Sequence, residues 1–106
     1  MRLPRSMLRD SISIEPHAGN TAYGSKYGAG YSESCIFEPG FKKIVDRQGA
    51  EVVASAFCIL GATATVKTLD RVTKDGQVYE VIDSQQRPVN GRIDHVEVYL
   101  KSIGAE

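Results

Sequence analysis

The stretch from Asp70 to Ile82, which reads DRVTKDGQVYEVI, constrains the fold of this chain more than any other. Its first arm alternates polar residues with Val72, and its second arm, residues 77–82, is rich in β-branched and aromatic residues. Asp75-Gly76 stands between the arms, and Asp-Gly favours a tight turn because glycine takes a positive φ without steric cost. The stretch therefore predicts a β-hairpin.

A second run, HVEVYL at residues 95–100, alternates apolar and polar side chains, as a strand does when one face meets a core. With the hairpin it has the pattern of an antiparallel meander. We expect the apolar residues of these strands to supply much of the core, namely Val78, Val81 or Ile82, Val96, Val98 and Leu100.

The rest of the chain adds short strands and turns, consistent with its ten glycines and four prolines. We expect strands at residues 11–15, 33–38 and 92–100, a hairpin at 41–57 that turns at Arg47-Gln48-Gly49, a long loop at 17–32, and connections at 61–69 and 83–91. Pro16 and Pro39-Gly40 are expected to end the first two strands. The alanine-rich and valine-rich residues 50–60 are also compatible with a helix.

These elements predict an all-β fold, a small antiparallel β-barrel with long flexible loops, with a sandwich as the alternative arrangement. We expect a flexible N-terminal arm at residues 1–10, a single barrel domain at 11–101 and a C-terminal tail at 102–106. No apolar run approaches the roughly 20 residues that span a bilayer, and no secretory signal follows the basic start.

Charge and cysteine content narrow the class of protein. The 13 basic and 13 acidic residues balance, so the chain lacks the net positive charge typical of nucleic-acid binders. Cys35 and Cys58 have no metal-site spacing, and we expect two reduced thiols packed as small hydrophobic groups in an intracellular protein. A disulfide between them is the alternative.

Catalytic signals are weak. A Cys-His dyad would pair Cys35 or Cys58 with His17 or His95, but no local nucleophile motif supports it. A zinc site would need the same four scattered residues, without the paired spacing of known sites. We therefore expect no enzyme, no metal and no cofactor.

Two surface features are candidates for binding. Tyr23, Tyr27 and Tyr31 in the glycine-rich loop are interface candidates because tyrosine is enriched at protein interfaces, although they would also suit base stacking. Lys42, Lys43 and Arg47 form a local cationic cluster. It is either a solvated hairpin face or a surface for an acidic partner such as DNA phosphates.

Five stretches carry a resemblance to a known family: ISIE at residues 12–15, YSESC at 31–35, VDRQGAEVV at 45–53, DRVTKDGQVYEV at 70–81 and HVEVYL at 95–100. In order and spacing they resemble the head-completion or stopper proteins of long-tailed bacteriophages, which are also called head-tail connector or minor capsid proteins. The resemblance covers about residues 11–100. It departs before the hairpin, where the family often has Pro-Gly-Asp and this chain has Lys67-Thr68-Leu69-Asp70.

The resemblance implies a structural protein of the virion that is made in the bacterial host cytoplasm and has no membrane partner. Its partners would be portal and adaptor ring proteins, tail proteins and further copies of itself, although the isolated chain would be a monomer. The assembled ring would close the DNA exit channel after packaging, let double-stranded DNA pass through it, and dock the tail.

In that family a long loop projects into the channel and helps to form a gate. The resemblance places this loop at about residues 41–54, with the gate residues Phe41, Lys42, Lys43, Ile44, Val45, Asp46, Arg47, Gln48, Gly49, Glu51, Val52 and Val53. The rival hypothesis is a stand-alone small β-barrel that binds single-stranded nucleic acid or a peptide, which a basic groove interleaved with the tyrosines would favour.

Overall fold

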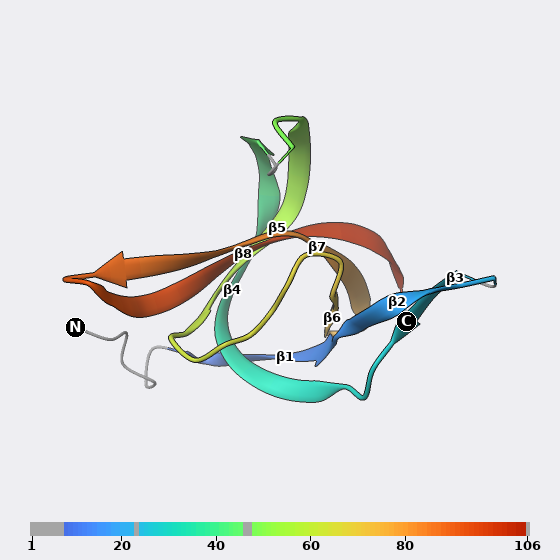
Figure 1. The fold of residues 1–106 in the computed structure, drawn as a ribbon, viewed down its shortest axis with the longest axis horizontal. Coiled ribbons are helices and arrows are strands. Elements are labelled where there is room, and N and C mark those ends of the chain that lie inside the picture. Colours follow the sequence, from blue (N-terminus) through green and yellow to red (C-terminus); the bar gives the residue numbers. More distant parts are fainter. Residues whose placement is uncertain (1–7, 23, 46–47, 106) are drawn as a thin grey trace.

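The computed structural model describes residues 8–22, 24–45 and 48–105, and in them it contains strands and turns but no helix. The strands are β1 (Asp10–Glu15), β2 (His17–Thr21), β3 (Gly24–Tyr27), β4 (Tyr31–Val45), β5 (Glu51–Gly61), β6 (Arg71–Lys74), β7 (Gln77–Val89) and β8 (Arg92–Ala105). Six of them form a closed antiparallel barrel in the order β1-β4-β5-β8-β7-β6, and β2 and β3 form a separate hairpin (Figure 1). The predicted all-β barrel is confirmed.

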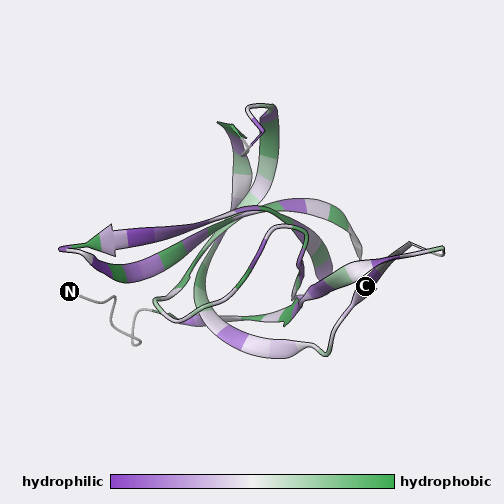
Figure 2. Cartoon of the chain, in the orientation of Figure 1, coloured by the Kyte–Doolittle hydropathy of each residue, from purple (hydrophilic) through white to green (hydrophobic). Residues whose placement is uncertain are grey.

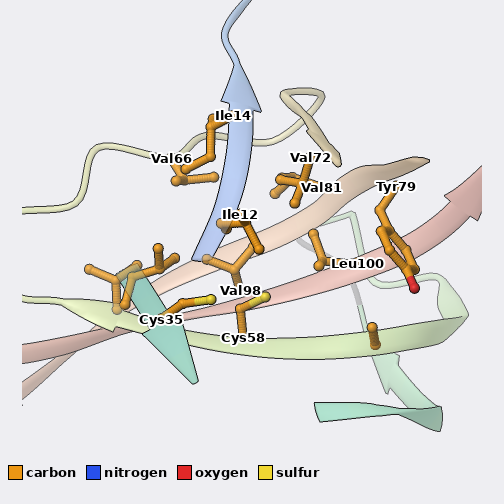
Figure 3. Packing of buried hydrophobic residues seen from close by; sticks show 13 residues of the cluster. Ile12, Ile14, Cys35, Cys58, Val66, Val72, Tyr79, Val81, Val98 and Leu100 are labelled. Atoms are coloured by element: carbon orange, nitrogen blue, oxygen red, sulfur yellow. The ribbon is translucent and has the colours of Figure 1, made fainter. Parts of the chain in front are cut away.

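The core fills the inside of this barrel (Figure 3). Alternate residues of the strands point inward, as the period of two requires. The most deeply buried side chains are Ile14, Leu60, Leu100, Val72, Val81, Val96, Val98, Cys35 and Cys58. Of the expected core residues, Val78 and Ile82 are only half-buried. Tyr79, Val81 and Asp83 are the buried residues of β7 and alternate regularly, so Val78 and Ile82 lie on its other face.

Truncating Val98 is expected to destabilise the protein by about 1–3 kcal/mol, because the change removes two buried methyl groups and leaves a cavity. Val98 is 1% exposed. The same change at Val53, which is 48% exposed, should cost less than about 1 kcal/mol. Denaturant unfolding of Val98→Ala and Val53→Ala measures both values, and equal costs would contradict the burial of Val98.

The predicted hairpin at residues 70–82 is confirmed, with Asp75 at φ 51° and Gly76 at φ 81° in the turn between β6 and β7. The first strand is also confirmed, and residues 51–61 form β5, so the alternative helix is wrong. Residues 62–70 form the expected connection. The segment 1–7 of the expected N-terminal arm lies outside the described residues.

Most of the expected loops are hairpins or continuous strands. Residues 17–32 contain the β2–β3 hairpin and the start of β4, and Gly28 N–H closes the hairpin base on the Pro16 carbonyl at 2.7 Å. Pro39-Gly40 does not end a strand, since β4 continues through a register shift. Residues 83–89 belong to β7, so only Asn90-Gly91 turns, and β8 includes residues 102–105 of the expected tail.

The buried Asp70 joins three segments at the base of the β6–β7 hairpin. Its Oδ1 accepts a hydrogen bond from His17 N–H at 2.8 Å, and its Oδ2 accepts one from Lys67 N–H at 2.9 Å. Its backbone carbonyl accepts Val81 N–H at 2.9 Å. The carboxylate therefore holds β2 and the connection against the barrel.

Candidate functional site

The end of the β4–β5 hairpin leaves the barrel as a separate two-stranded arm, which we call the gate arm (residues 41–45 and 48–54). Beyond Pro39 the ladder shifts register and resumes with the pairs Lys42–Ala54, Lys43–Val53, Ile44–Val52 and Val45–Glu51. Gly40 lies in the shift at φ 145°, a conformation that residues with a Cβ rarely adopt. The strands bend at this point, and the gate arm stands away from the barrel (Figure 1).

The gate arm exposes large apolar side chains. Phe41 is 85% exposed, Val45 61% and Val53 48%, and Figure 2 shows hydrophobic stretches on both strands. The pairs Lys43–Val53 and Val45–Glu51 share the exposed face of the ribbon, whereas Ile44 and Val52 on the other face are half-buried. Exposed apolar groups gathered on a ribbon without its own core are typical of protein interaction sites.

Lys42 fixes the base of the gate arm. Its ammonium lies 5.7 Å from the ring centre of Phe57 and 5.5 Å from that of Tyr99, and these two rings are 5.1 Å apart. Contacts of this kind stabilise by about 0.5–1 kcal/mol where the cation is exposed. Lys42 is thus engaged within the chain, whereas Lys43 is exposed. Asp46 and Arg47 lie outside the described residues, so the predicted cationic cluster is only partly described.

The interface tyrosines occupy different surroundings. The Tyr27 ring lies 4.2 Å from the Arg71 guanidinium and makes an edge contact with His17 at 5.7 Å. Arg71 also donates two hydrogen bonds to Glu15, at 2.9 and 2.7 Å, which lower the pKa of that carboxyl. Tyr31 is 38% exposed on β4, and Tyr23 lies outside the described residues.

The four residues considered for a dyad or a zinc site are dispersed. Cys35 and Cys58 are free, buried and adjacent inside the barrel, where the hydrogen bond that the Cys58 thiol donates to Cys35, together with burial, raises the pKa of Cys58 (Figure 3). His17 lies at the β2–β3 hairpin and His95 on β8. In residues 8–22, 24–45 and 48–105, no three His, Cys, Asp or Glu side chains are grouped to hold a metal ion.

A polar cluster on the outer face of β7 and β8 was not predicted. His95 is hydrogen-bonded to Asp94 at 2.9 Å and to Glu97 at 3.1 Å, and Arg87 Nε donates to Glu97 at 2.8 Å. Burial lowers the pKa of His95, but the hydrogen bonds to both carboxylates outweigh it and the net pKa is raised. In the sequence, Asp94, His95 and Glu97 lie close together in D-H-V-E. Arg87 comes opposite them only because β7 extends to Val89 and pairs with β8, which the sequence did not indicate.

The stability of the protein should fall as the pH rises through the raised pKa of His95. Because the folded pKa exceeds the ordinary value of 6.5, protonated His95 stabilises the fold fully below that value, and its contribution disappears above the folded pKa. Denaturant unfolding across this range, compared with His95→Gln, measures the effect. The variant should show a flatter pH dependence, and parallel curves would contradict the assignment.

Comparison with known proteins finds no family model that matches the chain and no curated protein that matches it significantly. The described residues contain no helix that is long and apolar enough to cross a membrane.

Proposed function

We propose that this chain is a structural head-tail connector protein of a long-tailed bacteriophage. In this role it forms a ring below the portal and adaptor, closes the DNA exit channel after packaging, and docks the tail. The observation that carries the proposal is the gate arm, which projects from a closed barrel and exposes Phe41, Val45 and Val53. A ring subunit needs such projecting surfaces for its neighbours and needs no catalytic site.

The gate arm has the properties that a reversible closure requires. Its two strands pair with each other, and the outer edge of β4 beyond Cys35 has no strand neighbour among the described residues. Free strand edges pair readily with other chains, so arms from adjacent subunits can join across the channel. The balanced charge of the chain suits a channel through which DNA slides, because a strongly basic lining would hold the phosphates.

The rival hypothesis of a nucleic-acid-binding barrel gains less support. Base stacking requires open aromatic faces, and one face of Tyr27 is covered by Arg71. Lys42 is likewise engaged with Phe57 and Tyr99.

The test uses a phage that naturally encodes this chain. Its gene is deleted, and heads that have packaged DNA are prepared from the deletion strain. Adding the purified chain should restore DNA retention and tail joining, measured as nuclease-protected DNA and as infectious particles. Heads that retain DNA and accept tails without the chain would refute the proposal. Binding of single-stranded nucleic acid by the purified chain, without any effect on heads, would favour the rival.

A further inference from the structure

A groove separates the gate arm from the barrel. Its volume is about 520 Å³. Its apolar lining comes from Val52 of the gate arm, Leu69 of the connection before β6, and Val81 and Ile82 of β7. Glu80 and Lys101 add one charge of each sign. A cavity of about 150 Å³ is enough to hold benzene, so this groove has room for several apolar side chains of a partner.

Leu69 gives a second indication that the groove has a function. Its backbone lies in the left-handed region at φ 77°, which is unfavourable for a large side chain, and its side chain is 45% exposed. Leu69 N–H donates to the Val81 carbonyl at 3.0 Å, and this bond and the contacts of Asp70 hold the conformation. Strained residues persist where the surrounding structure imposes them, and they concentrate at binding sites.

The far end of the β7–β8 hairpin has the exposed apolar and charged side chains that would fit this groove. Beyond the last β5–β8 pair at His95, these strands pair only with each other and form a second projecting ribbon (Figure 1). Its turn, Asn90-Gly91, is flanked by Val89, which is 39% exposed, and by Arg92. We call residues 88–92 the β7–β8 tip. It presents an apolar side chain next to a cation that has no ion-pair partner among the described residues.

We propose that the β7–β8 tip of one copy docks into the groove of a second copy, with Val89 against Leu69 and Ile82 and with Arg92 near Glu80. The contact deepens the proposed function, because it gives the ring its subunit interface. In Figure 1 the β7–β8 ribbon extends to the left, whereas the late part of β8, which contributes to the groove, lies to the right of the upright arm. Contacts between two different surfaces join copies head to tail and generate a ring where the rotation closes.

Strand edges can strengthen this contact. On the side away from β8, residues 85–89 of β7 have no strand neighbour in the part of the chain that the structure describes. Residues 51–54 of β5 lie next to the groove, and among the described residues they also have no strand neighbour on the side away from β4. An inserted tip can therefore add main-chain hydrogen bonds to the burial of Val89.

Cysteine trapping of the purified chain tests the contact. A variant with Val89→Cys and Thr68→Cys carries one reactive thiol at the β7–β8 tip and one at the groove, where Thr68 is exposed. The native Cys35 and Cys58 are fully buried and should not react. With a short bismaleimide, which captures transient contacts between copies that are monomeric at equilibrium, the double variant should give a ladder of cross-linked multimers, because each copy offers both halves of the contact. Each single variant should give little beyond monomer.

Charge variants of the double-cysteine protein show whether the trapped contact is specific. Arg92→Glu should reduce cross-linking several-fold at low salt, because it opposes Glu80. The matched control, Lys26→Glu on the β2–β3 hairpin, should leave it unchanged. Cross-linking of the double variant no greater than that of the two single variants, or an equal loss in both charge variants, would overturn the proposal. Since the assay uses the isolated chain, its failure is separate from a failure to retain DNA in heads.

Discussion

Shortening the tip of the gate arm should leave the chain folded but let packaged DNA escape from assembled heads. Val45 and Glu51 are opposite each other in the ladder, so replacing residues 46–50 with Asn-Gly closes the ribbon with a two-residue turn and shortens it by three residues. No residue of the gate arm belongs to the main core cluster. The melting temperature should therefore change by no more than about 4 °C, whereas nuclease-protected DNA should fall to a small fraction of the wild-type level.

A variant of unchanged length is the control for this experiment. Replacing residues 46–50 with five glycine and serine residues keeps the reach of the gate arm and should retain more DNA than the shortened chain. A large loss of melting temperature in the shortened chain would mean that the gate arm is part of the barrel wall. Full retention of DNA by a folded, shortened chain would show that the gate arm does not close the channel.

The parts of the fold that could be predicted are those in which local pattern and burial agree. The Asp75-Gly76 turn and the alternation of residues 95–100 both mark strands with one buried face, and the structure has β6, β7 and β8 there. The projecting ribbons lack this agreement. Residues 84–89 and the described part of the β2–β3 hairpin are exposed or half-buried, and their polar and glycine-rich sequence resembles that of loops.

Bulges explain most of the remaining errors. Pro39-Gly40 indicates the end of a strand in isolation, but here it bends β4 without ending it, and the residues after it form the gate arm. On β7 the buried residues Tyr79, Val81 and Asp83 follow a regular alternation, which leaves Ile82 half-buried, and the register shift between Val81 and Asp83 changes only the pairing with β8. A pattern of period two cannot reveal the insertion of one residue unless the partner strand is known.

The candidate site could be predicted only in part from the sequence. The gate residues Phe41, Val45 and Val53 were named, but their exposure depends on the bend at Gly40. The groove that we assign to a second copy could not be foreseen, because its lining comes from β5, the connection before β6, β7 and β8. Leu69 gave no signal of its strained backbone, since leucine rarely adopts a positive φ.

Removing the carboxylate of Asp70 should be among the most destabilising single changes outside the apolar core. Asp70 is 5% exposed, and its two oxygens accept His17 N–H and Lys67 N–H. Asp70→Ala removes the acceptor of both donors, and a hydrogen bond to a charged group contributes about 1.5–3 kcal/mol. We expect a loss of about 2–5 kcal/mol in the free energy of unfolding, measured by denaturant titration.

The matched control is Glu38→Ala, which removes an exposed carboxylate and should change the free energy by no more than about 0.5 kcal/mol. Because Asp70 also holds the backbone on both sides of Leu69, its loss should loosen the groove before the whole barrel unfolds. Hydrogen exchange can detect this, since the Leu69 amide should lose protection in Asp70→Ala more than the Val98 amide does. Equal stability of Asp70→Ala and Glu38→Ala would mean that solvent replaces the carboxylate, and that the sequence of the connection alone maintains the strained conformation of Leu69.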